Sequence, residues 1–487
     1  MNAEQMAAVA EAEKEKLEIE EEFQVWERNA IYLYDYQQTY GLEWPSLTVQ
    51  WLPGMRDDPE HRDKCVQSLI LGTHAEEGEP NYLLVAEVTM PLPESEIDLR
   101  VGKLDDVESG NYKKHSEANA MIQYKTRIRH DGEVNRARFM PQNSKIIATK
   151  CPSSTVYVFD VEKHAELPND DKVHAQHECS GHGTEGYALS WNPNADGQLL
   201  SGAGDGSVCI WNLKEAGFNA APLHKLEQVH RNGVEGLDWH RYHDNIFGTV
   251  GNDGCIAIHD MRGSLGSGAQ RLREVHAGDV HCIAFNPNNE HLFATGGADH
   301  AVNLWDLRKP GDKLHAFEGH TKEVLSLDWA PYDEAVLGSS SADRRVNIWD
   351  VNKIGNEQTP EEAEDGPPEL YFVHAGHKAA VSDFSWNAHG DFAGVVASVD
   401  ERNVLQIWQS VDLDEDEEGE GEMSGVADAD LESDVKEEAG VDRKSKTDIV
   451  QERKEEKAHE REDAQAAMPN GGAEGSPDAK KPRVSFA

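Results

Sequence analysis

A histidine recurs six times along this chain, and each one is followed about thirty residues later by an aromatic or imidazole side chain that ends a short apolar run. The separation is 29 residues in the first five pairs and 31 in the last, and the leading histidines are 44 to 57 residues apart. The pairs are His130–Phe159, His182–Trp211, His230–His259, His276–Trp305, His320–Trp349 and His377–Trp408. A repeat of this length, which in one copy opens with Gly-His and closes with Trp-Asp, is typical of β-propeller blades.

Three alternating, strand-like runs precede the first repeat and predict one more blade, which lacks the histidine–tryptophan pair. They are Trp44–Trp51, Val66–Leu71 and Tyr82–Val88. With the six repeats they predict an all-β fold, a seven-bladed WD-repeat propeller over residues 36–411. Before it, residues 3 to about 29 lack Pro and Gly and are rich in Ala, Glu, Lys and Leu. This composition predicts a long helix within an N-terminal unit of residues 1–35.

Within the repeats, a hydroxyl, a carboxylate and the closing tryptophan follow the histidine at fixed steps. Three sets share them: His182, Ser201, Asp205 and Trp211; His276, Thr295, Asp299 and Trp305; His320, Ser339, Asp343 and Trp349. A chain of hydrogen bonds is expected from indole through hydroxyl and imidazole to carboxylate. The sets resemble a hydrolase triad in composition, but three copies at blade spacing without a G-x-S-x-G motif favour a structural role. His259 in place of Trp, and Arg402 in place of Asp six residues before Trp408, predict weaker networks in two blades.

The chain carries 91 acidic against 46 basic residues, a formal net charge of −45. Such a surface repels phosphate backbones, so a basic protein partner is favoured and direct nucleic-acid binding is not expected. Solubility alone is the alternative explanation of the charge. Six scattered cysteines without a CxxC pair are expected to be reduced core residues. The sequence shows no secretory signal and no long apolar run, so no membrane association is expected.

The composition changes abruptly after Gln409. Residues 411–440 hold fourteen Asp or Glu and a single Lys. A segment of this kind cannot bury a core, so residues 412–487 are predicted to form a disordered acidic tail. A basic cluster of Lys480, Lys481 and Arg483 lies in its last part and suggests nuclear import, so the nucleus is the expected location, with the cytoplasm as a second one.

The residues three and five positions after each leading histidine are expected to face the narrow top of the ring, near its central channel. Five of the six repeats place a carboxylate there. The positions are Glu133 and Asn135, Glu185 and Tyr187, Gly233 and Glu235, Asp279 and His281, Glu323 and Leu325, and Ala380 and Ser382. Crowded carboxylates repel one another unless a cation is present. This top face is therefore predicted to bind Lys or Arg side chains, with a merely solvated rim as the alternative.

An acidic insertion with two prolines precedes the last repeat and includes Glu361, Glu362 and Asp365, with Tyr371 and Phe372 shortly after it. It is expected to clamp a basic amphipathic helix against the N-terminal helix, and an ordinary solvated loop is the alternative.

Four zinc-ligand side chains fall within nine residues: His174, His177, Cys179 and His182. Their spacing matches no closed four-ligand pattern, and His182 already belongs to a blade. No metal site and no cofactor are therefore predicted, and no phosphate-binding or dinucleotide motif stands out.

Four segments resemble the retinoblastoma-associated histone-binding WD-repeat proteins, also called the multicopy-suppressor-of-Ira-like family. They are EWPSLTVQWLP (43–53), HDGEVNRARFMPQNSKIIATKCPSSTVYVFD (130–160), EGYALSWNPN (185–194) and EDGPPEL (364–370). The likeness covers roughly residues 20 to 410 and is much more specific than a generic WD repeat. It implies a histone-binding subunit shared among chromatin assembly factor, type B histone acetyltransferase, histone deacetylase, nucleosome-remodelling and Polycomb complexes.

The resemblance also implies two binding sites. A groove for the first helix of histone four would have Tyr32 and Leu33 as apolar contacts, Phe372 across from them, and Glu361, Glu362 and Asp365 facing histone arginines. On the top face, Glu133, Asn135 and Glu185 would hold a lysine of a histone three tail, Tyr187 and Glu235 an arginine, and Glu323 belongs to the same face. Two departures weaken that second site: the family usually has an aromatic where this chain has Leu325, and Asn where it has His281.

These inferences converge on a non-enzymatic histone-binding adaptor and chaperone subunit with histones three and four as partners. A substrate receptor or scaffold in a ubiquitin ligase assembly is the alternative, since propellers often serve there. A hydrolase that uses the repeated histidine sets is a third hypothesis, and it is not expected.

Overall fold

The structure is a computed structural model that describes residues 3–59, 61–92, 122–263, 270–272, 275–360 and 362–411, with side chains given from residue 13 on, except at 271. The predicted acidic tail (412–487) and the predicted site residue Glu361 therefore lie outside the described residues. None of the helices in these ranges is both long and apolar enough to cross a membrane.

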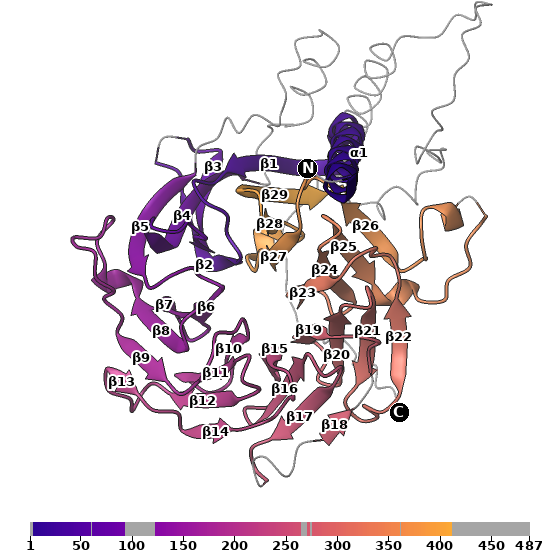
Figure 1. The fold of residues 1–487 in the computed structure, drawn as a ribbon. Coiled ribbons are helices and arrows are strands. Elements are labelled where there is room, and N and C mark those ends of the chain that lie inside the picture. Colours follow the sequence, from indigo (N-terminus) through magenta and orange to yellow (C-terminus); the bar gives the residue numbers. More distant parts are fainter. Residues whose placement is uncertain are drawn as a thin grey trace, which may run out of the picture. The chain divides into compact units, whose positions relative to one another are not determined.

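The described strands form seven sheets around a ring, the blades of a β-propeller (Figure 1). Blades are numbered here by the chain order of their innermost strands. Blade 1 is β2 (Val49–Asp57), β3 (Lys64–Gly72), β4 (Asn81–Pro91) and β5 (Gln123–His130). Blade 2 is β6 (Arg136–Met140), β7 (Asn143–Lys150), β8 (Thr155–Asp160) and β9 (His177–Ser180), with the short β13 (Asn219–Ala220) added parallel to β9. Blade 3 is β10 (Leu189–Trp191), β11 (Gln198–Gly202), β12 (Val208–Asn212) and β14 (His224–Leu226).

The remaining blades follow the same order from the channel outward. Blade 4 is β15 (Val234–Trp239), β16 (Ile246–Gly251), β17 (Ile256–Asp260) and β18 (Gln270–Leu272). Blade 5 is β19 (Val280–Phe285), β20 (Leu292–Gly297), β21 (Val302–Asp306) and β22 (Lys313–Phe317). Blade 6 is β23 (Val324–Trp329), β24 (Val336–Ser341), β25 (Val346–Asp350) and β26 (Leu370–His374). Blade 7 is β27 (Val381–Trp386), β28 (Val396–Asp400), β29 (Val404–Ser410) and, outermost, β1 (Tyr34–Gly41).

Blade 7 closes the ring by joining the two ends of the propeller. Its outermost strand β1 comes from the start of the chain and pairs antiparallel with β29, from Tyr34 opposite Ser410 to Gly41 opposite Val404. The helix α1 (Ala3–Leu33) leads directly into β1, so this pairing also fixes where the helix ends. The predicted seven-bladed propeller with a long N-terminal helix is confirmed.

The sequence predicted the first strands less well than the blades. Residues 31–40 showed a cluster of tyrosines but no clear strand pattern, yet Tyr34–Gly41 is β1, because its edge pairs with β29 rather than with a sequence neighbour. The run predicted as a strand from Trp44 becomes one only at Val49. Before that point, the Ser46 hydroxyl donates to the Thr48 carbonyl and accepts from the Gly72 amide, so the chain bends there instead.

Four short 3-10 turns complete the described elements: η1 (Val161–Lys163), η2 (Val351–Lys353), η3 (Glu362–Glu364) and η4 (Gly390–Phe392). The core lies between neighbouring blades rather than at one centre. Between blades 4 and 5, for example, Val250 and Ile256 pack with Phe285, Phe293 and Trp305. Each blade therefore depends on contacts with its two neighbours, as in other repeat folds.

The predicted hydrogen-bond chains are present in blades 5 and 6. In blade 6, the Trp349 indole donates to Ser339 Oγ at 2.8 Å, His320 Nε2 lies 2.7 Å from the same hydroxyl, and His320 Nδ1 lies 2.9 Å from Asp343. In blade 3 the chain has one more member than predicted. His182 Nδ1 contacts Ser207 Oγ, and that hydroxyl donates to Asp205, so the carboxylate is reached through a second serine.

The prediction of two weaker networks is wrong. In blade 7 the carboxylate comes from Asp400, two residues before Arg402, and it lies 2.9 Å from His377 Nδ1. The spacing of the other repeats did not reveal Asp400, because the segment from Asp400 to Trp408 is two residues longer than the corresponding segment in those repeats. In blade 4, His259 replaces the indole: its Nε2 lies 3.1 Å from Thr249 Oγ1, which also contacts His230 Nε2. The incomplete network is the one in blade 2, where Phe159 has no polar atom to offer and His130 Nδ1 faces a backbone carbonyl.

These networks predict a measurable contribution to stability in blade 7. Ser398→Ala removes the hydroxyl that links the Trp408 indole and His377, and it leaves two buried groups without a partner. We expect a loss of about 1–3 kcal/mol in the free energy of unfolding, equal to the effect of Ser339→Ala in blade 6. Urea denaturation followed by tryptophan fluorescence measures both. The exposed Ser180→Ala is the control, and a Ser398→Ala effect no larger than this control would contradict the account.

Candidate functional site

The last turns of α1 are held against blades 6 and 7 by a buried aromatic cluster. Phe23 and Trp26 are each 8% exposed. The Trp26 indole donates to the Tyr34 hydroxyl at 2.9 Å, and that hydroxyl lies 2.8 Å from His374 Nδ1. Burial raises the pKa of Tyr34 and lowers that of His374 well below its usual value, so both side chains are neutral. This polar chain sets the rotation of the helix about its axis.

Three ion pairs lie along the same helix, before the aromatic cluster in the sequence. Glu15, Glu20 and Glu22 face Lys322, Lys378 and Arg344 at N···O distances of 3.6, 2.9 and 2.6 Å. All three carboxylates are about half exposed or more, so solvent weakens each pair. The aromatic cluster, rather than these pairs, is therefore expected to dominate the attachment of α1.

The residues predicted for the helix groove lie in two places around this attachment. Tyr32 and Leu33, at the end of α1, are 55% and 38% exposed. Phe372, on β26, is instead 8% exposed, because its ring packs on Tyr34 at 5.3 Å and on Trp408 at 5.8 Å between centroids. Phe372 therefore packs inside the aromatic cluster and offers little exposed surface to a ligand. The contact between Phe372 and Tyr34 places β26 beside the start of β1, where α1 ends.

That segment is ordered by its own hydrogen bonds. The amide of Thr359 donates to the Glu362 carboxylate at 2.7 Å, and the Glu362 amide donates back to the Thr359 hydroxyl, which is a capping box. Gln358 donates to the carbonyl of Gly366, whose φ of +130° is accessible to glycine. Glu362 and Asp365 are both exposed, and the Asp365 side chain has no hydrogen bond or ion pair among the described residues. Asp365 is therefore the more available of the two for a cationic partner.

Four of the six residues predicted for the top face are brought together by the structure. Burial raises the pKa of Tyr187, the negative charges of Glu185, Glu235 and Glu133 raise it further, and Arg136 lowers it, so all three carboxylates lie within electrostatic range of this side chain. Tyr187 is 41% exposed. Glu133 faces His74 at 3.2 Å, and Glu235 accepts from Asn252 at 2.7 Å. The contacts to His74 and Asn252 were not foreseen, because both residues lie outside the positions counted from the leading histidines.

The two other predicted residues have different surroundings. Asn135 is 2% exposed, and its amide lies 3.5 Å from the Gly186 carbonyl, so it supports the segment that carries Glu185 and Tyr187. Glu323 is exposed and lies 3.5 Å from His281, a channel-facing residue that shares a cavity of about 180 Å³ with Tyr187 and Glu235. Glu323 therefore extends the acidic rim through His281.

Two cations inside the channel share one buried anion. Arg136 and Arg138 contact the fully buried Asp383 at 2.9 and 3.0 Å. Burial would raise the pKa of Asp383, but the guanidinium groups of Arg138 and Arg136 hold it below its usual value. Thr48 and the amide of Val49 also donate to this carboxylate, which ties blade 1 to blade 7. Neither arginine forms an ion pair with a carboxylate of the top face, so those carboxylates remain available to a ligand.

The four side chains of zinc-ligand type near residue 180 have other roles, and Cys179 is buried in a hydrophobic cluster. His174 contacts Asp170, His177 contacts the Gly217 carbonyl, and His182 belongs to the blade 3 network. Among the residues that the structure describes, no three His, Cys, Asp or Glu side chains are grouped so as to hold a metal ion.

Comparison with protein families identifies the N-terminal part of the chain. Residues 21–92, which contain the end of α1, β1 and most of blade 1, match a family model that describes the histone-binding protein RBBP4 and its counterpart in the CAF1 complex. Residues 174–212, 269–306 and 311–350 match the model of the WD domain, G-beta repeat. Together these matches support the histone-binding WD-repeat family for this chain. The segment that matches the histone-binding model includes the end of α1 and β1, which attach the helix to the ring.

The attachment of α1 to the ring can be tested directly. Trp26→Ala removes a buried indole together with its hydrogen bond to Tyr34, and we expect it to weaken docking of the helix by about 3–5 kcal/mol. Amide hydrogen exchange in residues 23–33 should then rise at least tenfold, with blades 2–5 unchanged.

The matched control is Glu22→Ala, which removes the partly exposed pair with Arg344 and should cost no more than about 1 kcal/mol. Equal exchange in the two variants would show that the aromatic cluster is not what holds the helix.

Proposed function

We propose that this chain is a non-enzymatic, histone-binding adaptor and chaperone subunit. The observation that carries the proposal is the match of residues 21–92 to a histone-binding family model, since these residues build the helix attachment described above. On the top face and on the segment before β26, Glu185, Glu235 and Asp365 are carboxylates without an ion pair among the described residues. Histones are basic, so both surfaces complement such a partner in charge.

The first proposed site receives the first helix of histone four. Tyr32 and Leu33 offer exposed apolar surface at the end of α1, and Glu362 and Asp365 offer carboxylates on the segment before β26. An amphipathic helix with an apolar stripe and arginines beside it satisfies both at once. Glu361 belongs to this proposal through its sequence position alone.

The second proposed site is the top face, which receives the basic tail of histone three. Glu133, Glu185 and Glu235 around Tyr187 suit a chain of lysines and arginines, and the exposed tyrosine ring adds a surface on which a guanidinium can stack. Leu325 replaces an aromatic found in relatives, so we expect weaker arginine binding here, by about 0.5–2 kcal/mol.

As an adaptor, the chain would work within larger assemblies. We propose that it serves chromatin assembly, histone acetyltransferase, deacetylase, remodelling or Polycomb complexes in the nucleus. None of the described contacts favours the ubiquitin-ligase alternative over this proposal.

The two sites should respond separately to charge reversal. Glu362→Lys with Asp365→Lys should weaken binding of a peptide from the first helix of histone four at least tenfold, because arginines would then face lysines. Glu185→Lys with Glu235→Lys should weaken binding of a histone three tail peptide to the same extent. Fluorescence anisotropy with both peptides on both variants measures the four affinities.

The control carries the same change in charge elsewhere. Asp171→Lys with Glu215→Lys alters two exposed acids in loops of blades 2 and 3, outside the two proposed sites. If this control weakens the binding of either peptide as much as the site variants do, the binding depends on net charge alone and the assignment of the two sites is wrong.

A further inference from the structure

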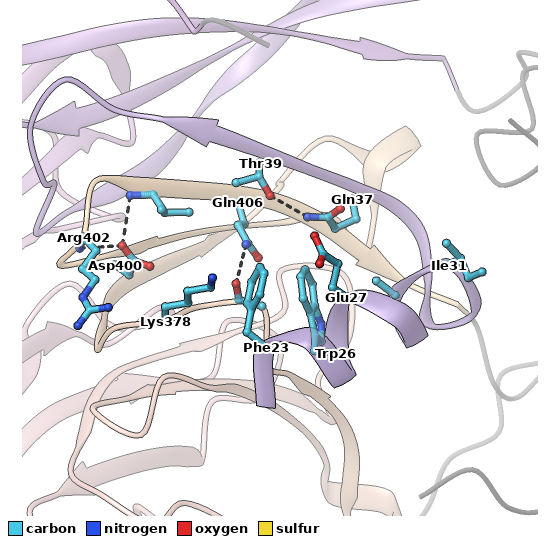
Figure 2. Close-up of a pocket in the computed structure, with 13 residues that line it drawn as sticks. Phe23, Trp26, Glu27, Ile31, Gln37, Thr39, Lys378, Asp400, Arg402 and Gln406 are labelled. Atoms are coloured by element: carbon cyan, nitrogen blue, oxygen red, sulfur yellow. Dashed lines mark hydrogen bonds between the residues drawn. The ribbon is translucent and has the colours of Figure 1, made fainter. Parts of the chain in front are cut away.

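A cavity of about 250 Å³ lies between α1 and blade 7 (Figure 2). Phe23, Trp26, Ala30 and Ile31 line it from the helix, and Val404 and Gln406 from β29. Tyr32 is nine positions after Phe23, and at 100° per residue these two side chains leave the helix on opposite faces. The cavity therefore does not belong to either histone site proposed above. Its volume equals that of roughly eight water molecules at ~30 Å³ each.

Most polar groups in the cavity already have partners. Lys378 pairs with Glu20 and lies 3.9 Å above the Phe23 ring. Asp400 is engaged by His377 and by the amides of Arg402 and Val404. The amide of Gln406 donates to the Gly376 carbonyl, and that of Gln37 to Thr39, as Figure 2 shows.

Three groups are left over. Gln406 Oε1 is buried and has no hydrogen-bond partner among the described residues, although the amide nitrogen of the same side chain donates to Gly376. Glu27 Oε1 is buried and has no hydrogen-bond partner among the described residues. Arg402 is exposed, and its guanidinium has neither an ion pair nor a hydrogen bond to any described residue. A buried acceptor without a donor is costly, so a ligand that supplies an N–H to Glu27 gains free energy there. Arg402 in turn favours a carboxylate.

The loops beside the cavity strengthen this preference for an anion. Lys322, Arg344, Arg345, Lys378 and Arg402 all lie on the loops of blades 6 and 7 that flank α1. Three of them pair with glutamates of α1, and Arg345 and Arg402 show no ion pair among the described residues. Arg345 and Arg402 are therefore the two cations of this set that remain available to an anionic ligand.

We propose that this cavity is a third docking site, for an acidic peptide segment of a partner protein with one leucine-like anchor. The aliphatic side chain would fill the space between Phe23, Trp26 and Ile31 and displace water from an apolar lining. A backbone N–H beside it would donate to Glu27, and an adjacent carboxylate would pair with Arg402. The charge preference is the reverse of that proposed for histones, so the two kinds of partner would not compete.

The test uses the full chain and four synthetic peptides. The probe is an acetylated, amidated heptapeptide with a central leucine flanked on each side by Asp-Glu-Asp. Its three controls replace the leucine by serine, the acids by their amides, or the acids by lysine. Saturation-transfer NMR should show the leucine methyl groups of the probe as its most strongly saturated protons. All three controls should bind at least tenfold more weakly, by titration of a fluorescent version.

Two variants of the protein locate the binding. Arg402→Glu reverses the charge of the unpaired side chain, and Ala30→Leu fills the cavity. Each variant should bind the probe at least fivefold more weakly. Arg262→Glu, which makes the same charge change at a 67% exposed arginine of blade 4, should leave it unchanged. Three results would overturn the proposal: equal binding of the leucine and serine peptides, equal binding of the lysine peptide, or indifference to both cavity variants. Self-association of the chain that Arg402→Glu abolishes would assign the cavity to a second copy and overturn it as well.

Discussion

The pairing of β1 with β29 is the interaction on which the rest of the structure depends. A propeller has no covalent closure, so blade 7 must be built from both ends of the repeat region, and here Tyr34–Gly41 completes the sheet begun by β27, β28 and β29. The same strand is continuous with α1. Closure of the ring and placement of the helix are therefore one event, and the Tyr34 hydroxyl, between Trp26 and His374, connects the two.

A second constraint is the separation of charge inside and outside the channel. Asp383 collects two arginines, a threonine hydroxyl and a backbone amide from blades 1 and 2, so the cations of the channel are paired with an anion below the rim. On the top face, Glu133 and Glu235 contact His74 and Asn252 instead, and neither these two nor Glu185 forms an ion pair with a Lys or Arg among the described residues. The carboxylates of such a surface repel one another. Binding of a cationic ligand relieves this repulsion and therefore gains free energy.

The repeat itself was readable from the sequence because each blade encodes its own hydrogen-bond chain locally. The histidine-to-aromatic spacing predicted six blades, and the positions counted from it placed Glu133, Glu185, Tyr187 and Glu235 around one another. What could not be predicted depends on contacts between distant residues. Strand β1 has no local partner, Phe372 is covered by Tyr34 from the other end of the chain, and Asp400 was hidden by a spacing two residues longer than in the other repeats.

The end of α1 and the segment before β26 are central to the proposed function, because together they would hold a histone helix. The most direct measurement places a photo-reactive benzoylphenylalanine at Tyr32 of the full chain and irradiates it with histones three and four. Mass spectrometry should find attachment to the first helix of histone four, and the same residue placed at the similarly exposed Tyr242 should give none. No attachment from Tyr32, or equal attachment from both positions, would contradict the proposed groove.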